Sequence, residues 1–462
     1  MKKNPVTSPE RRSFLKAAAG FMGASLLGGL PLRAFAQSAS LAPPDRCFVF
    51  VYFAGGWDQL LAFDPRDPDV FTPERVAETR ILPGYNLIND ARFSSQPLVP
   101  ATRSGAAASQ LVFGPAVGRL ADHYDLMAVV RGINMTTLGH EVGMRYFITG
   151  KRPIGSAARG ASTATEVVGQ LVPAVPIPSI AYGMESYNDR YPGRANALKV
   201  SRANDLLLTL SPSSTQLDSE LEKQLLNFRG QPVTCEAAAY GTGGVGTAYE
   251  TSRGQMQQVL SSRLDNAFRF ERAEHEELRT FYGLPSTGPY DSAAGRAALV
   301  ATALKKGISQ CVSINLVGGL DTHFGTQTTH ASNLRTGFDA LATLVDDLRR
   351  SAHPSGGNFM DHTTLLVFSE FARTPLINAT GGRDHHLSSS CLLMGAGLKH
   401  NVAFGHTGDI GMAPGLVDLK TGVPNPSTGD NILPEHIIAT VLASAGLDYS
   451  ITRVDPLRAL LA

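Results

Sequence analysis

The sequence is poor in cysteine, in tryptophan and in net charge. It has four cysteines and one tryptophan among 462 residues, and 41 basic side chains against 40 acidic ones. A balanced surface without a basic run argues against nucleic acid as a partner. The cysteines form no C-x-x-C pair, so we expect buried free thiols, with a disulfide as the alternative in an oxidising compartment; they are Cys47, Cys235, Cys311 and Cys391.

Several motifs that define common enzyme classes are also missing. The chain has no G-x-S-x-G sequence, which argues against a serine hydrolase with a nucleophile elbow. Gly241–Gly246 matches the G-x-G-x-x-G pattern, but the preceding Cys235–Tyr240 is alanine-rich and does not predict a strand. Dinucleotide binding requires a strand, a loop and a helix in that order, so we expect a loop here. After the N-terminal segment no apolar run reaches 18 residues, and we expect no membrane span in the mature chain.

Residues 1–36 predict an export signal. Arg11-Arg12 precedes the apolar segment Ala17–Leu30, and Ala34-Phe35-Ala36 offers an A-x-A cleavage site. The apolar segment has 14 residues, too few to span about 30 Å of hydrocarbon. We therefore expect a cleaved twin-arginine (Tat) signal, the Tat machinery as a partner, and a periplasmic or extracellular protein. Cleavage removes six basic residues and one acidic residue, which leaves 35 basic, 39 acidic and a net charge of −4.

The remaining residues, 37–462, predict one α/β domain. Continuous apolar runs are typical of strands covered on both faces, and helical patterns alternate with them, so we expect a mainly parallel sheet between helices. Loop and helical insertions are expected around 60–110 and 185–290. The expected strands are Arg46–Ala54, Asp125–Arg131, Ile177–Tyr182, Ser309–Val317, Thr363–Ser369 and Ser390–Met394. The expected helices are Pro115–His123, Glu141–Thr149, Thr247–Tyr282, Asp291–Lys306, Ala331–Arg350 and Pro434–Ala445.

Acidic residues and histidines follow several of these runs. Eight of the twelve histidines lie in the 84 residues from His323 to His406. Asp321 and His323 follow one strand, Glu370 follows another, and His385-His386 come after a glycine turn. Because the carboxyl ends of strands in an open α/β sheet hold ligands, this pattern predicts a metal site.

Two further segments are expected at the same edge of the sheet. Gly55-Gly56 permit a tight turn after the first strand and place Asp58 just beyond its end. Thr137 and His140 precede the helix expected over 141–149, and a helix start offers free N–H groups to an anion. A hydroxyl or an imidazole there is a candidate nucleophile or acid–base group.

Together these residues resemble the exported bacterial family called domain of unknown function 1501, within the alkaline phosphatase and sulfatase superfamily. The matching motifs are Asp58, the segment Thr137–Gly150, Gly319–His323, Ser369–Pro375 and Asp384-His385. The resemblance implies an alkaline phosphatase-like fold, one or two divalent metal ions (zinc, manganese, magnesium or calcium) and hydrolysis of small anionic esters.

The resemblance also implies roles for individual residues. Metal ligands would be Asp58, Asp321, His323, Glu370 and one of His385 and His386, since adjacent residues in an extended segment point to opposite sides. Arg373 would clamp an anion, and His140 and Thr137 are the further catalytic candidates. Asp384 would orient the ligand histidine.

Each role has a structural alternative. Asp321 could cap a loop, Glu370 could pair with Arg373, and His140 could act as an acid, a ligand or a plain loop residue. The other histidines of the window are assigned to core or surface, with His406 as an outside candidate; they are His330, His353, His362 and His400.

Three functions are compatible with these observations. The first is a metal-dependent hydrolase of phosphate, sulfate or related esters. The second is a non-catalytic envelope protein that keeps the fold as a binding or assembly scaffold, which the lack of a clear nucleophile favours. The third, a carrier of a transition metal, fits the carboxylate-rich site least well.

Overall fold

A computed structural model describes residues 44–172, 174–211, 262–325 and 327–462, with residues 220, 221, 224 and 227. The predicted signal over residues 1–36, the glycine-rich Gly241–Gly246 and Cys235 lie outside this part of the chain. No helix within the described part has the length and apolar character needed to cross a membrane.

The core of the protein is an eight-stranded mixed sheet in the order β10-β2-β9-β6-β1-β5-β3-β4. All strand pairs are parallel except those that β9 makes with β2 and β6. The expected class, an α/β fold with a mainly parallel sheet, is therefore confirmed. The strands are β1 Cys47–Phe53, β2 Met127–Asn134, β3 Ser179–Tyr182, β4 Leu198–Val200, β5 Cys311–Val317, β6 Thr363–Phe368, β9 Ser388–Gly395 and β10 Val402–Phe404. A separate two-stranded hairpin pairs β7 Ala372–Arg373 with β8 His385–His386.

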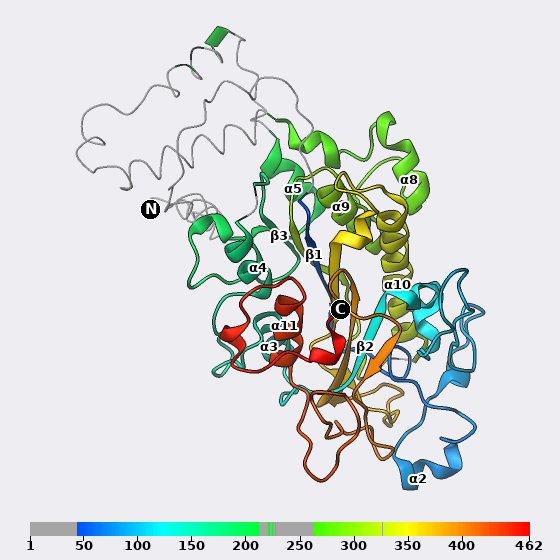
Figure 1. The fold of residues 1–462 in the computed structure, drawn as a ribbon. Helices are drawn as coiled ribbons and strands as arrows, with labels where there is room; N and C mark the ends of the chain where they lie inside the picture. The colour runs from blue at the N-terminus through cyan, green and yellow to red at the C-terminus, as the bar shows by residue number, and fades with distance from the viewer. Residues whose placement is uncertain are drawn as a thin grey trace, which may run out of the picture.

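Helices cover both faces of this sheet (Figure 1). One face carries α3 His140–Thr149, α4 Thr163–Leu171 and α11 Pro434–Ala443. The other carries α9 Ala293–Lys305, α10 Gln327–Arg350 and the 3-10 segment Pro115–Leu126. Shorter elements lie between them: α2 Val76–Thr79, α5 Ala203–Leu210, α8 Glu276–Tyr282, and 3-10 turns at Pro73–Arg75, Tyr85–Leu87, Gly193–Ala195, Leu264–Phe268, Ala273–His275, Phe359–His362, Ser450–Thr452 and Arg458–Leu460.

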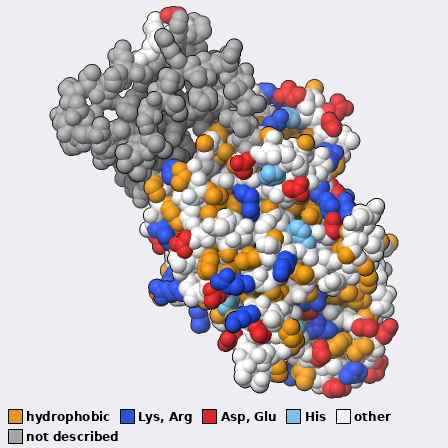
Figure 2. Space-filling view, viewed as in Figure 1, with side chains coloured by type: hydrophobic (Ala, Val, Ile, Leu, Met, Phe, Trp, Pro, Cys, Tyr) orange, Lys and Arg blue, Asp and Glu red, His pale blue; other side chains and the backbone are white. Residues whose placement is uncertain are grey.

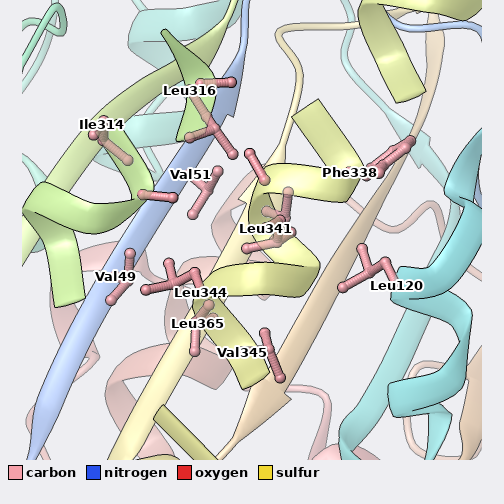
Figure 3. Packing of buried hydrophobic residues seen from close by; sticks show 14 of the residues in the cluster. Val49, Val51, Leu120, Ile314, Leu316, Phe338, Leu341, Leu344, Val345 and Leu365 are labelled. Carbon is pink, nitrogen blue, oxygen red and sulfur yellow. The ribbon is translucent and has the colours of Figure 1, made fainter. Parts of the chain in front are cut away.

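The central strand β1 is buried along its whole length because both of its neighbours and both helix layers cover it. Side chains alternate between the faces of a strand, so Val49 and Val51 pack on the α10 side while Phe48 and Phe50 pack on the α3 side. Figure 3 shows Val51 near Leu341 and Val49 near Leu344, both of α10. Burial of each such side chain contributes about 1.5–3 kcal/mol, which makes β1 a rigid support for the loop that follows it.

Two expected helices differ from the structure. The described part of Thr247–Tyr282 is not one helix: it is broken by non-helical backbone at Arg269, and α8 begins only at Glu276. Phe268 and Phe270 are both buried in the same core, and residues two apart cannot share a helical face, so packing overrides helical propensity here. Pro115–His123 belongs to a 3-10 segment, with a kink at Gly118 where the Arg335 side chain packs.

The surface is mixed in character. Figure 2 shows acidic and basic side chains interspersed on the visible face. The three described cysteines, Cys47, Cys311 and Cys391, are free and buried, as expected. Burial raises the pKa of each thiol, which makes these cysteines poor nucleophiles.

Candidate functional site

Three loops meet at the carboxyl ends of β1, β5 and β6. Gly55, directly after β1, has φ +117°, and a Cβ there would lie 2.4 Å from the backbone N of Asp321 after β5. Only glycine permits this contact. Gly143 on α3 approaches the third loop in the same way, because its Cβ would lie 2.5 Å from the backbone O of Glu370. Glycines therefore let four segments of backbone converge on one place.

The buried carboxylate of Glu370 organises this place. Its Oε1 accepts a hydrogen bond from Gly55 N at 2.9 Å and faces His140 Nδ1 at 2.6 Å, while its Oε2 lies 2.8 Å from Ser369 Oγ. The hydrogen bond between Glu370 Oε1 and His140 Nδ1 raises the pKa of His140, whereas burial lowers it. Nearby Tyr52 is buried too, and its pKa is raised by burial and then by the charge of Glu370. Glu370 therefore fixes His140, the first residue of α3. It was predicted as a metal ligand, with a pairing to Arg373 as the alternative, but its oxygens instead contact Gly55, His140 and Ser369.

His140, Asp321 and His385 form the candidate metal site. Each offers one ligand atom, and these atoms lie within 4.8 Å of one another. His140 Nε2 is 3.4 Å from Asp321 Oδ2, and His385 Nε2 is 3.6 Å from Asp321 Oδ1. Bonds of about 2.0–2.1 Å to a tetrahedral ion place ligand atoms roughly 3.3 Å apart. The two separations are close to that value, although they involve different oxygens of Asp321.

Three histidines turn the same ring nitrogen toward Asp321. His140 Nδ1 lies 2.6 Å from Glu370 Oε1, His385 Nδ1 lies 2.6 Å from Leu138 O, and His323 Nδ1 lies 2.8 Å from Asp384 Oδ1. These partners can only accept, so each Nδ1 carries a proton, and Nε2 is the nitrogen of each ring that is left to bind an ion. This is the arrangement in which outer acceptors orient metal-ligating histidines.

The Nε2 atoms of this cluster face Asp321, and two of them face each other. His140 Nε2 is buried and has no hydrogen-bond partner. His323 Nε2 and His385 Nε2 face each other at 2.8 Å, with Asp321 Oδ1 at 3.2 Å from the first. At that distance one of the two nitrogens donates a hydrogen bond to the other. The donor set of histidine nitrogens around one carboxylate fits a divalent cation.

Arg373 has a different use from the predicted one. Its side chain is fully buried, and its guanidinium donates to Gly55 O, to Gly56 O at 3.1 Å, to Arg383 O at 3.1 Å and to Asp321 Oδ1 at 2.6 Å. These contacts leave it unable to clamp a substrate anion. Arg373 instead positions Asp321. Burial raises the pKa of the Asp321 carboxyl, but the hydrogen bond from Arg373 and the charge of Arg373 together bring it below its ordinary value.

Asp58 also lies apart from the cluster. Its Oδ2 pairs with Arg383 Nε at 2.9 Å and accepts from Gln327 Nε2 at 3.0 Å, while its Oδ1 accepts from Leu60 N at 2.9 Å. Both partners of the ion pair are at most 3% exposed. With both oxygens bonded to the protein, Asp58 joins three segments of chain, in place of the predicted metal coordination.

Three further candidates, His386, Asp384 and Thr137, do not contribute ligand atoms to this cluster. His386 points away from His385, and burial lowers its pKa, in line with the expectation that one histidine of the pair faces the site. Asp384 orients His323, whereas the sequence predicted that it orients His385. Thr137 Oγ1 accepts a hydrogen bond from Gly139 N at 3.2 Å, and the structure gives it no contact with the histidines.

His330, assigned to core or surface from the sequence, joins two of the site's loops. Its Nε2 accepts from Asp58 N at 2.9 Å, and its Nδ1 lies 2.8 Å from Thr322 Oγ1. Sequence reasoning had no signal for this role beyond the position of His330 early in α10. Burial lowers the pKa of His330 to about 4.

The low pKa of His330 predicts an acid-sensitive fold. An unfolded histidine has a pKa near about 6.5, so protonation favours the unfolded chain. The contribution of His330 is complete above about pH 6.5 and is lost as the pH falls toward about 4, which amounts to about 3 kcal/mol. Denaturant unfolding of wild type and His330→Gln at pH 7 and pH 4.5 measures this. We expect a smaller loss of unfolding free energy with acid in the variant; equal losses would refute the assignment.

These observations define an α/β protein with a candidate His/Asp metal site at the carboxyl edge of its sheet. The chain belongs to the family described as "Protein of unknown function (DUF1501)", which matches residues 45–450. This confirms the family named from the sequence motifs.

Solved structures give distant matches. "Crystal structure of Ps i-CgsB" matches with TM-score 0.37 and 9% identity, covering 89% of this chain and 74% of that one. The alkaline phosphatase from the Antarctic bacterium TAB5 matches with TM-score 0.29 and 9% identity, covering 79% of this chain and 95% of that one. At this level the matches support no inference about activity. Comparison with curated proteins gives no match.

Proposed function

We propose that the protein is an exported, metal-dependent hydrolase of a phosphate, sulfate or related ester. The observation that carries the proposal is the common orientation of His140, His323 and His385 around Asp321, with a buried Nε2 on His140 that makes no hydrogen bond. Orientation of this kind, held by outer acceptors, is what metal-ligating histidines require.

The donor set also favours particular ions. Imidazole nitrogens with one carboxylate suit zinc or manganese better than magnesium or calcium, which take mainly oxygen ligands. His140, Asp321 and His385 would hold the ion, with His323 beside it. A divalent ion held here supplies Lewis acidity to an ester oxygen and to water.

Other residues of the chain hold the site together. Glu370 keeps the Nδ1 proton on His140, and Arg373 fixes the direction of Asp321. The start of α3, at His140, would offer free backbone N–H groups to an oxyanion formed during ester cleavage. The twin-arginine segment Arg11-Arg12 supports export, and Tat translocation of a folded chain would allow the metal to be loaded beforehand.

Metal analysis combined with a panel of esters tests the proposal. We expect protein purified from its export compartment to contain about one zinc or manganese ion per chain and to hydrolyse at least one p-nitrophenyl ester among phosphate, sulfate and phosphodiester. Removal of the ion by a chelator should abolish hydrolysis, and its return should restore it. Metal without turnover of any ester would contradict the hydrolase, and absence of metal after reconstitution would contradict the site itself.

A further inference from the structure

Two histidines outside the His/Asp cluster lie face to face beside the start of β1. The ring centroids of His353 and His362 are 3.8 Å apart, and the ring planes differ by 17°. His353 is 4% exposed and lies in the loop between α10 and the 3-10 turn Phe359–His362. Like charges at such a distance repel each other. The stacked pair can therefore accommodate one proton charge much more easily than two.

The two rings and a serine hold the residues that precede β1. His353 Nε2 lies 3.3 Å from Pro44 O, and His362 Nδ1 lies 2.9 Å from Asp45 O. The Ser355 hydroxyl donates a hydrogen bond to Asp45 Oδ1. We refer to these three side chains, together with Pro44 and Asp45, as the clasp. The clasp fixes the point at which the chain enters β1.

The partners of the two rings assign their protons. A carbonyl oxygen can only accept, so His353 carries a proton on Nε2, while its Nδ1 accepts from Ser355 N at 3.2 Å. His353 is therefore neutral in the clasp. His362 faces carbonyl oxygens with both nitrogens, at Asp45 O and, at 2.8 Å, at Gly356 O. Both contacts are hydrogen bonds when each nitrogen carries a proton, so the complete clasp has one charge, and that charge lies on His362.

A second proton would break the clasp. On His353 it would turn Nδ1 into a donor that faces the N–H of Ser355, and it would place two cations in stacked rings. Burial, and then the charge of His362, lower the pKa of His353. A histidine whose pKa is lowered by folding stabilises the folded form above about pH 6.5, and this contribution is lost as the pH falls. Acid therefore favours the open clasp.

The other charged groups near the two histidines do not reverse this direction. The charge of Asp45 opposes the lowering of the His353 pKa, but burial and His362 outweigh it. Asp361 Oδ2 accepts from a backbone N–H of its own turn at 2.8 Å. Arg46 directs its guanidinium to oxygens of other segments. The cation that His353 meets across the stacked rings is therefore His362.

We propose that His353 and His362 form a pH-sensitive clasp, which holds the start of β1 at neutral pH and releases it in acid. The proposal goes beyond the proposed function and does not depend on it, because neither histidine belongs to the His/Asp cluster. Cys47 is a natural reporter of release. It is 0% exposed, and its Sγ lies 3.8 Å from Pro44 O, so an open clasp would uncover its thiol.

Thiol labelling of the wild-type protein at pH 7 and pH 5 tests the clasp. Each rate is divided by that of glutathione at the same pH, which removes the effect of pH on the reagent, and peptide mass mapping separates the cysteines. We expect the rate at Cys47 to rise at least about 3-fold in acid. Cys391, 0% exposed in β9, reports opening of the sheet and should change clearly less. An unchanged rate at Cys47, or equal rises at both cysteines, would refute the clasp.

Substitution of His353 identifies the responsible ring. In His353→Gln the amide can still donate to Pro44 O and accept from Ser355 N, but it does not titrate, so the acid response of Cys47 should disappear. Thermal unfolding shows whether the variant is folded, and the wild-type comparison decides the question if it is not. A response that survives in folded His353→Gln would overturn the proposal.

Two further variants complete the test. His362→Gln removes the neighbouring charge and should shift the acid response of Cys47 to lower pH, and an unshifted response would contradict the role of His362. The matched control is His275→Gln, because His275 Nε2 also faces a carbonyl oxygen, that of Asn266 at 3.1 Å, outside the clasp. His275→Gln should keep the full response, and its loss there would assign the response to a general effect of removing a histidine.

Discussion

The Asp321→Asn variant is expected to lose metal affinity and ester hydrolysis by about 100-fold or more. Asp321 is the carboxylate toward which His140, His323 and His385 direct their Nε2 atoms. Changes to residues that merely orient ligands already cost about 10- to 100-fold, so loss of a ligand charge should cost at least as much. Asparagine still accepts the hydrogen bond from Arg373, which protects the fold. Metal content after dialysis, with kcat/KM on the best ester, measures both losses.

A matched control lies elsewhere in the chain. Asp346 is a 39% exposed aspartate that pairs with Arg119 at 3.3 Å and with His123 at 3.2 Å, so it resembles Asp321 in surroundings but not in location. Asp346→Asn should retain metal and activity. If Asp321→Asn retained its metal as well, the candidate site would be rejected.

The Asp58→Ala variant is expected to be severely destabilised without losing the metal site. Removal of this carboxylate leaves the Arg383 guanidinium buried and unpaired, which costs about 3–5 kcal/mol. It also removes the acceptors for Gln327 Nε2 and Leu60 N. Thermal and denaturant unfolding measure the loss. Metal bound per folded chain, determined at low temperature, should equal that of wild type.

Two comparisons make this prediction specific. Asp90→Ala breaks an ion pair with Arg92 on the surface, and the melting temperature should hardly change, because exposed pairs contribute little. Asp58→Asn, which keeps an acceptor for Leu60 N, should be less destabilised than Asp58→Ala. If Asp58→Ala instead lost its metal at unchanged stability, Asp58 would be a metal ligand, as the sequence suggested.

Fold class was accessible from the sequence because its signals are local. Continuous apolar runs such as Arg46–Ala54 and Thr363–Ser369 predicted buried strands to within a few residues, and alternation with helices predicted the mainly parallel sheet. The short strands β4 and β10, and the helices α4 and α5, were missed. They are brief, and their stability comes from packing more than from a distinctive sequence pattern.

The candidate site was accessible only in outline. Residue type and position after a strand placed Asp321, His323 and His385 near one edge. The direction of each side chain was not accessible. Whether Asp58 faces the histidines or Arg383 depends on the backbone angle φ at Gly55 and on the placement of α10, and no sequence motif encodes either. The same limit explains Arg373, whose guanidinium is directed inward by carbonyls from three other residues.

The partner of each site residue is distant in sequence, and this has a consequence for biosynthesis. Glu370 meets His140 across 230 residues and Gly55 across 315, and His385 is supplied by a hairpin just before β9, the strand that runs against its neighbours. A ribosome-bound chain that has not yet emerged past His385 lacks one residue of the cluster. The candidate site can therefore form only after nearly the whole chain has been made and has folded.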